Sequence, residues 1–323
     1  MTASPTDVRT YDLDIDVTAS LPFVQSSTTL AATVWPSPSE HLVAVLVCWP
    51  GGSYSRAYWD MHIAGRDGYS FADHMVARGF TVAAIDPLGV GGSTRPEDVD
   101  SVTFETMTDA AASAVRQLRD RLAPNDEPVF GIGHSLGGCL TLVEQARSGS
   151  YDAVANLGFT HGAKPIHSPD PADDGSESEA LALAVEHAKA FFGGQWDDGY
   201  ALAPREPNHG WLHDPDVPAD VVAEDDLRAS AWPRQSYVGA LLAGHSASYA
   251  ATVSCPVFVG FGEHDVPEHP HDDVGYYSAS DDVTLVVLPG SAHCHNFAGT
   301  REVLWDRLAN WAGGFGRGVW STR

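Results

Sequence analysis

The chain of 323 residues is poor in positive charge and has no long apolar run. It holds 18 lysines and arginines against 43 aspartates and glutamates, a formal net charge of -25, and its only lysines are Lys164 and Lys189. Nucleic acids and anionic membranes would repel such a chain, so neither is an expected partner. No segment approaches the roughly 20 apolar residues of a membrane-spanning helix. Residues 1–14 carry no signal-peptide pattern, so we expect a cytoplasmic protein.

The chain also lacks paired cysteines, metal-binding motifs and internal repeats. Its cysteines show neither metal-ligand nor disulfide-framework spacing, so we expect reduced thiols. They are Cys48, Cys139, Cys255 and Cys294. Histidines and carboxylates crowd residues 264–273, but Pro267 and Pro270 indicate an exposed turn whose spacing fits no helix-borne or ribbon-type site. We therefore expect no metal and no cofactor.

Apolar periodicity predicts strands that alternate with helices. The predicted strands are residues 11–18, 29–35, 41–49, 80–85, 129–134, 153–159, 257–261 and 283–288, and the predicted helices are 71–78, 106–122, 136–148 and 301–311. The first two strands are expected to form an antiparallel edge. The rest predict a mostly parallel sheet covered on both faces, with its sites at the carboxyl ends of the strands.

This alternation stops between residues 161 and 241, where the chain is acidic, dotted with proline and rich in aromatic residues. We expect residues 1–160 and 242–323 to form one core and residues 161–241 to be an insertion. The aromatic residues of this segment include Phe191, Phe192, Trp196, Tyr200, Trp211, Trp232 and Tyr237.

The most informative motif is the Gly-X-Ser-X-Gly run centred on Ser135, which joins an apolar strand directly to a helix. Such an elbow is so tight that glycine is needed two residues to either side, and it projects the serine hydroxyl at the edge of the sheet. The helix starting at Leu136 directs its free amides to the same point, which supplies half an oxyanion hole. The similar run at residues 244–248 lacks the strand and the closing glycine, so we interpret it as an ordinary helix segment.

A serine nucleophile needs a base and a carboxylate that orients the base. Asp265 follows the strand at 257–261, and His293 follows the strand at 283–288. The chain order Ser135, Asp265, His293 is the order typical of α/β-hydrolases.

Further segments carry motifs of that family. Residues 80–86 with the glycine-rich run to Ser93, the turn at 262–265 and the loop at 290–293 resemble its conserved segments, although Ala292 stands where glycine is usual. Over nearly its whole length, the chain resembles the α/β-hydrolase fold family with a cap domain. The resemblance implies an α/β fold, a largely helical cap at 161–241 and a serine hydrolase.

Four nearby residues compete for the same roles. His295 is the rival base, but the loop length favours His293, and Glu263 precedes the position at which the family places its carboxylate. Cys294 could support a thiol mechanism, yet Ser135 is the better placed nucleophile. His134 lies at a middle position of the motif, which packs rather than reacts.

The family takes its second oxyanion amide from the loop after the third strand, which here begins Pro50-Gly51 where His-Gly is common. Alignment with the family makes Gly52 the donor and Ser53 the next in line.

Residue types separate several chemistries of this fold. Dehalogenases and epoxide hydrolases need an aspartate at position 135, and perhydrolases usually carry methionine where Leu136 stands. Carbon–carbon bond hydrolases share the same triad and stay open, as do a general carboxylesterase and a non-catalytic binding protein. The main prediction is hydrolysis of an ester or lactone. Residues 50–59 and 291–297 also resemble bacterial lactonases acting on zearalenone, a macrocyclic lactone, which becomes the candidate substrate.

The aromatic insertion predicts a closed apolar chamber over Ser135 for a small apolar ester or lactone. Predicted substrate contacts are Ser53, Tyr54 and His134 beside the nucleophile, with Phe191, Trp196, Trp211, Trp232 and Tyr237 from the insertion. The short N-terminal strands and the tail at 313–320 are candidates for contact with a second copy of the chain.

Overall fold

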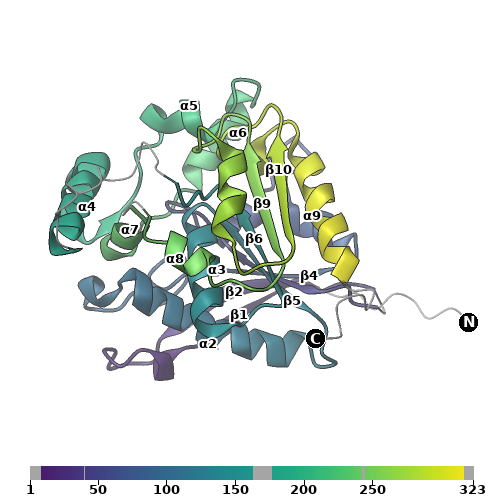
Figure 1. The fold of residues 1–323 in the computed structure, drawn as a ribbon, viewed down its shortest axis with the longest axis horizontal. Coiled ribbons are helices and arrows are strands. Elements are labelled where there is room, and N and C mark those ends of the chain that lie inside the picture. The colour runs from purple at the N-terminus through teal and green to yellow at the C-terminus, as the bar shows by residue number, and fades with distance from the viewer. Residues whose placement is uncertain (1–8, 40, 163–176, 242–243, 316–323) are drawn as a thin grey trace, which may run out of the picture.

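A computed structural model, which describes residues 9–39, 41–162, 177–241 and 244–315, is built around an eight-stranded sheet (Figure 1). The strand order is β1-β2-β4-β3-β5-β6-β9-β10. Only β2 runs against the others, which confirms the antiparallel edge and the mostly parallel sheet. The strands are β1 (Tyr11–Asp16), β2 (Thr29–Trp35), β3 (Val45–Trp49), β4 (Thr81–Ile85), β5 (Val129–His134), β6 (Ala153–Leu157), β9 (Val257–Gly262) and β10 (Val283–Leu288).

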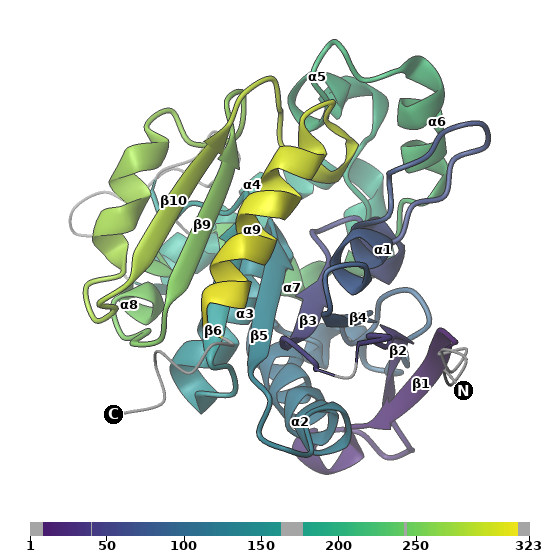
Figure 2. The ribbon, with the colours of Figure 1, turned by 90° about the vertical axis from the view of Figure 1, so that its right-hand side faces the viewer.

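Helices cover both faces of this sheet (Figure 2). Alternate residues of β3 show the two layers: Val47 packs into the apolar cluster of α2 and α3, and Leu46 into that of α1 and α9. The covering helices are α1 (Phe71–Val76), α2 (Phe104–Leu122), α3 (Leu136–Ser148), α8 (Ala247–Ala250) and α9 (Arg301–Phe315). In the described part of the chain, no helix is both long and apolar enough to cross a membrane.

The predicted elements recur, with shifts at their ends. The strands at 29–35 and 283–288 and the helix at 136–148 have the predicted bounds. The strand expected from residue 41 begins only at Val45, because Val43 donates its amide to Gly79 outside the ladder. The second helix begins two residues early, at Phe104, because the side chain of Thr103 caps it.

Between β6 and β9 the chain leaves the sheet and forms a largely helical segment. Its helices are α4 (Glu177–Phe192), α5 (His209–Leu212), α6 (Ala219–Leu227) and α7 (Arg234–Leu241). The short strands β7 (Tyr200–Ala201) and β8 (Trp232–Pro233) pair with each other in a separate ladder. Helix α7 packs on α4 of the same segment and on α2 of the core, so the segment contacts the core through α7. The segment also holds the short 3-10 helices Gly193–Asp198 and Glu206–Asn208. Elsewhere, short 3-10 helices span Thr18–Ser20, Arg56–Trp59, Val99–Ser101, Pro270–Tyr276 and His295–Phe297.

One expectation needs correction, and another falls partly outside the described residues. The run at 244–248 is not a helix throughout: Gly244 adopts a positive φ, and the helix begins only at Ala247, after Ser246. Of the tail at 313–320, residues up to 315 belong to α9, and residues 316–320 lie outside the described ranges.

Helix α3 carries a carboxyl group inside the core. Glu144 is fully buried beside Tyr151, and burial raises its pKa to about 7, although the side chains of Ser150 and Tyr151 oppose the shift. The pKa of an unfolded glutamate is near 4.3, so the native state retains this proton while the unfolded chain loses it. The stability that Glu144 contributes to the native state therefore falls as pH rises from about 4.5 to 7.

We expect Glu144→Gln to stabilise the protein at pH 8, because the amide fills the same space without a buried charge. The gain is on the order of 3 kcal/mol at pH 8 and on the order of 1 kcal/mol at pH 5, where the native carboxyl is neutral and the unfolded one has only begun to ionise. Thermal unfolding at the two pH values measures it, and the exposed Glu97→Gln is the matched control. An equal change in melting temperature at pH 5 and pH 8 would contradict the assignment.

Candidate active site

Ser135 occupies the tight turn between β5 and α3, with φ 52° and ψ -121°. A side chain at Gly133 would collide with the backbone of Gly137, and one at Gly137 would collide with the carbonyls of Trp49 and Pro50. Only glycine fits at both positions, as the motif predicts. Leu136 opens α3, so its amide has no partner within the helix and lies beside the serine.

The carboxylate of Asp265 and the imidazole of His293 form a close pair. His293 Nδ1 donates to Asp265 Oδ1 over 2.6 Å, and the Asp265 side chain is fully buried. The amides of Gly262 and Val266 also donate to this carboxylate. Burial acts to raise the pKa of Asp265, but the charge and hydrogen bonds of the neighbouring imidazoles outweigh it and hold the pKa well below its usual value. Asp265 is therefore an anion that orients the ring of His293.

His295 shares the same carboxylate. Its Nε2 donates to Asp265 Oδ2 over 2.8 Å, and its ring is 1% exposed. His293 lines the cavity that contains Ser135, whereas His295 is not among the residues that line it. The two imidazoles therefore differ in their access to Ser135: His293 lines its cavity, and His295 does not.

His134 packs beneath this pair. Its ring stacks on Tyr58 at 4.6 Å between centroids, and its Nε2 donates to the carbonyl oxygen of His293 over 2.8 Å. Burial lowers the pKa of His134 well below its usual value, so the ring is neutral. Through this hydrogen bond His134 supports the loop that carries His293. It does not line the cavity.

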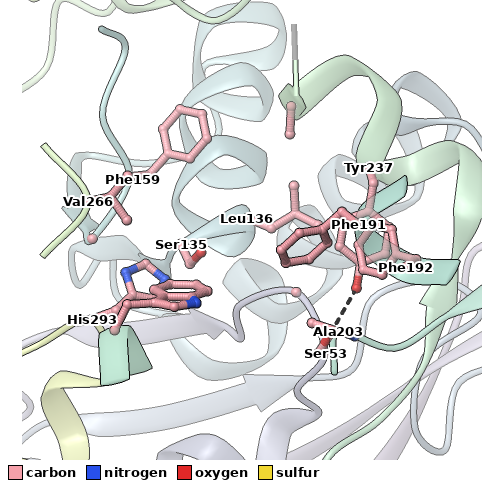
Figure 3. Close-up of a pocket in the computed structure, with 14 residues that line it drawn as sticks. Ser53, Ser135, Leu136, Phe159, Phe191, Phe192, Ala203, Tyr237, Val266 and His293 are labelled. Carbon is pink, nitrogen blue, oxygen red and sulfur yellow. Dashed lines mark hydrogen bonds between the residues drawn. The ribbon is translucent and has the colours of Figure 1, made fainter. Parts of the chain in front are cut away.

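The cavity in front of Ser135 holds about 650 Å³ of unoccupied space, part of it open to solvent. In Figure 3 the His293 ring points toward Ser135 from one side, and Phe191, Phe192 and Tyr237 form a wall on the other. The lining residues are mostly apolar: Gly52, Ser53, Ser135, Leu136, Gly158, Phe159, Phe191, Phe192, Ala203, Trp211, Tyr237, Ala240, Val266 and His293.

Not all predicted contacts reach this cavity. Trp196 packs on Phe192 at 6.0 Å, and the Trp232 indole donates to the Tyr54 carbonyl. The Tyr54 hydroxyl is itself bonded to Asp225 and close to Cys294. The structure places Tyr54, His134, Trp196 and Trp232 outside the cavity lining, and Gly52, Ser53, Phe191, Trp211 and Tyr237 within it.

Sequence reasoning missed several lining residues. Phe192 belongs to the aromatic run already noted, and Val266 directly follows Asp265, so both carried a signal. Phe159 was placed in a strand, but β6 ends at Leu157 and leaves it in the following loop. Ala203 and Ala240 carry no signal, because small apolar residues are common everywhere.

The histidines and carboxylates of residues 264–273 do not gather around one point. His264 pairs with Asp214 at 2.8 Å, Asp265 serves the two imidazoles, and Asp273 accepts from the amide of His161. In the described residues, the set close enough to share a metal ion is Asp60, His62 and Asp73, none of which lines the cavity.

The cysteines are free thiols. Cys294 is buried, which raises its pKa, and its sulfur contacts the Tyr54 hydroxyl at 3.1 Å. A buried protonated thiol is a poor nucleophile, so Cys294 does not compete with the partly exposed Ser135.

We expect an organophosphonate to label Ser135, because the strained elbow exposes its hydroxyl beside an imidazole. Intact-protein mass spectrometry should show one adduct, which Ser135→Ala abolishes. Ser246→Ala is the matched control, since Ser246 also contacts a histidine, His161 at 2.8 Å, but is buried. An adduct that persists in Ser135→Ala would refute the assignment of the nucleophile.

Known proteins resemble this chain in fold. A model of the alpha/beta hydrolase family matches residues 46–304, well over half of the sequence. None of the curated proteins compared with the chain matches it.

Similar solved structures include a highly thermostable carboxyl esterase from Bacillus coagulans, with a TM-score of 0.66 and 15% identity, covering 96% of this chain and 98% of that chain. A thermophilic esterase from Thermogutta terrifontis has a TM-score of 0.64 and 16% identity, covering 93% and 97%. The epoxide hydrolase CorEH has a TM-score of 0.60 and 16% identity, covering 95% and 100%. Identities this low show the fold alone, but the family model spans the strand–elbow–helix unit and both loops that follow β9 and β10. The chain belongs to the alpha/beta hydrolase family.

Proposed function

We propose that this protein is a serine hydrolase that cleaves the ester bond of an uncharged, apolar carboxylic ester or lactone. The observation that carries the proposal is the Asp265–His293 pair, which faces Ser135 across an apolar cavity. In this proposal Ser135 is the nucleophile, His293 the base and Asp265 the residue that orients the base.

In the first step the Ser135 hydroxyl oxygen attacks the carbonyl carbon, and its proton passes to Nε2 of His293. The negative charge on the carbonyl oxygen is stabilised by the amides of Leu136 and Gly52. The tetrahedral intermediate collapses, the alkoxide leaves with the proton from His293, and an acyl-serine forms. A lactone would stay tethered at this stage because its alcohol and acyl group belong to one molecule.

In the second step a water molecule attacks the acyl-serine. His293 accepts one proton from the water and returns it to the oxygen of Ser135, which releases a carboxylic acid. Throughout, the Asp265 carboxylate keeps the Nδ1 proton in place and stabilises the transient imidazolium.

The lining residues indicate the substrate class. The described lining contributes no carboxylate, ammonium or guanidinium group, and its aromatic side chains come largely from the segment between β6 and β9. We assign the insertion at 161–241, of which residues 163–176 lie outside the described ranges, as the cap that encloses the substrate. A charged acyl group would lose its hydration there without gaining a partner. Zearalenone, an uncharged lactone with an aromatic ring, fits this requirement and is our candidate substrate.

The two histidines can be separated by substitution. We expect Ser135→Ala and His293→Ala each to lower kcat for a p-nitrophenyl ester by about 10⁴-fold or more, since triad members act as a unit. His295→Gln retains a donor for Asp265 and should cost no more than about 10-fold. Steady-state kinetics on variants with matched melting temperatures measure these effects. If His295→Gln were inactive and His293→Ala active, the base would be His295.

The substrate class can be tested with a panel. We expect hydrolysis of neutral p-nitrophenyl esters and ring opening of zearalenone, seen by mass spectrometry as the addition of one water. An ester of equal size that ends in a carboxylate is the control and should react at least about 100-fold more slowly, because its charge cannot be solvated in the cavity.

Hydrolysis of short esters without ring opening of zearalenone would exclude the lactone as the substrate and indicate a general carboxylesterase. Cleavage of a carbon–carbon bond in a diketone without ester hydrolysis would favour the alternative hydrolase class. Ligand binding without any turnover or serine labelling would indicate a non-catalytic protein.

A further inference from the structure

Ser53 is a non-glycine residue held in a left-handed backbone conformation beside the nucleophile. Its φ is +67°, it is 2% exposed, and it lines the cavity with Gly52. The amide of Tyr54 donates to the carbonyl of Gly51 over 3.1 Å, so these four residues form a tight turn with Ser53 in its third position. A positive φ at that position is characteristic of a type II turn, which favours glycine. Something outside the turn must therefore favour serine in this conformation.

The contacts that hold Ser53 come from three separate segments of the cap. The amide of Ala203 donates to its Oγ over 2.8 Å, and the amide of Ser230 donates to its carbonyl oxygen over 2.9 Å. The Tyr237 hydroxyl lies 3.3 Å from the same Oγ, the contact dashed in Figure 3. The side-chain hydroxyl and the backbone carbonyl of Ser53 are thus hydrogen-bonded to the cap rather than to the loop that contains Ser53.

The cap also limits the space around the neighbouring glycine. A side chain at Gly52 would come within 2.8 Å of the Tyr237 ring and 3.4 Å of the Leu136 side chain. The turn is therefore enclosed between the start of α3 and helix α7 of the cap. Tyr237 in turn packs on Phe192 at 4.5 Å, which joins this contact to the aromatic wall of the cavity.

The conformation of Ser53 bears on the oxyanion hole. Type I and type II turns differ by a flip of their central peptide, here the one between Gly52 and Ser53. Such a flip exchanges the directions of the Ser53 N–H and the Gly52 carbonyl, which lie next to the peptide that carries the Gly52 amide, the proposed oxyanion donor. A Gly52 carbonyl turned toward the developing negative charge would repel it, so holding this peptide in one orientation preserves the surroundings of the Gly52 donor.

We propose that Ser53 is a positioning residue through which the cap sets the geometry of the oxyanion hole. This inference rests on the proposed function. The hydroxyl of Ser53 does not react; with its bonds to Ala203 and Tyr237 it keeps the turn from relaxing to the conformation that serine prefers. The cap thereby contributes to the chemical step as well as to enclosing the substrate.

The test compares Ser53→Ala with Ser53→Gly. Alanine loses the hydroxyl and still disfavours a positive φ, whereas glycine loses the hydroxyl and accepts it. We expect Ser53→Ala to lower the acylation rate by about 10-fold to 100-fold with little change in the substrate dissociation constant, and Ser53→Gly to recover a large part of that loss. Ser236→Ala, which removes a buried α7 hydroxyl bonded within the cap to Pro233, is the matched control and should acylate at the native rate.

The measurement is the pre-steady-state burst of p-nitrophenol, with rates expressed per site counted by the burst amplitude, so that misfolded protein does not contribute. A native acylation rate in Ser53→Ala, or equal losses in the alanine and glycine variants, would overturn the positioning role. Absence of any p-nitrophenol release and of serine labelling in the native protein would instead contradict the proposed hydrolysis, and the inference would fall with it.

Discussion

The close approach of backbones around Ser135 is the constraint on which the rest of the site depends. The Ser135 amide donates to the Leu157 carbonyl of β6 over 2.7 Å, and Gly137 lies against the carbonyls of Trp49 and Pro50 after β3. The elbow is therefore wedged between two neighbouring strands. Any side chain at Gly133 or Gly137 would separate α3 from the sheet and move the serine. Strain of this kind persists only where the surroundings determine it, as three strands and a helix do here.

The segment between β6 and β9 holds the loops that carry the site as well as covering them. The amides of His293 and Cys294 donate to the carbonyls of Trp211 and Leu212, so the histidine loop is bonded to α5. The Trp211 ring packs on the His293 ring at 4.6 Å. On the other side of Ser135, Ser53 is bonded to the same segment. Two loops that must be placed accurately are thus attached to one covering element, which reduces the freedom of each.

A buried polar network fixes how that segment sits on the core. Arg205 pairs with Asp225 and donates to the Tyr54 hydroxyl over 2.9 Å, and His213 bonds to Asp225 at 2.9 Å. Buried ion pairs add little net stability, because the loss of hydration offsets the attraction. A buried ion pair does require its two charged groups to adopt one relative position, because a displaced charge would remain buried without a partner. This network therefore favours one position of the segment over the many that apolar packing alone would accept.

Local patterns in the sequence determined the strands of the main sheet, the helices α1, α2, α3 and α9, and the Ser135 elbow, because strand periodicity, caps and the glycine requirement act over a few residues. They also placed Asp265 and His293, since each follows a strand whose carboxyl end must lie at the same edge of a parallel sheet. Loop length favoured His293 over His295 as the proposed base, and the structure adds which oxygen of Asp265 each imidazole meets and which of the two lines the cavity.

The same is true of the aromatic residues. Trp196, Trp211 and Trp232 look alike in sequence, yet only Trp211 lines the cavity, because packing among distant segments decides which ring turns inward. The contacts that carry the proposed role of Ser53 were equally out of reach, since its partners lie about 150 to 184 positions away along the chain. Sequence by itself determined the elements that carry the proposed reacting groups. Only tertiary packing decided which side chains meet, because contacts between remote segments depend on the whole fold and leave no local pattern.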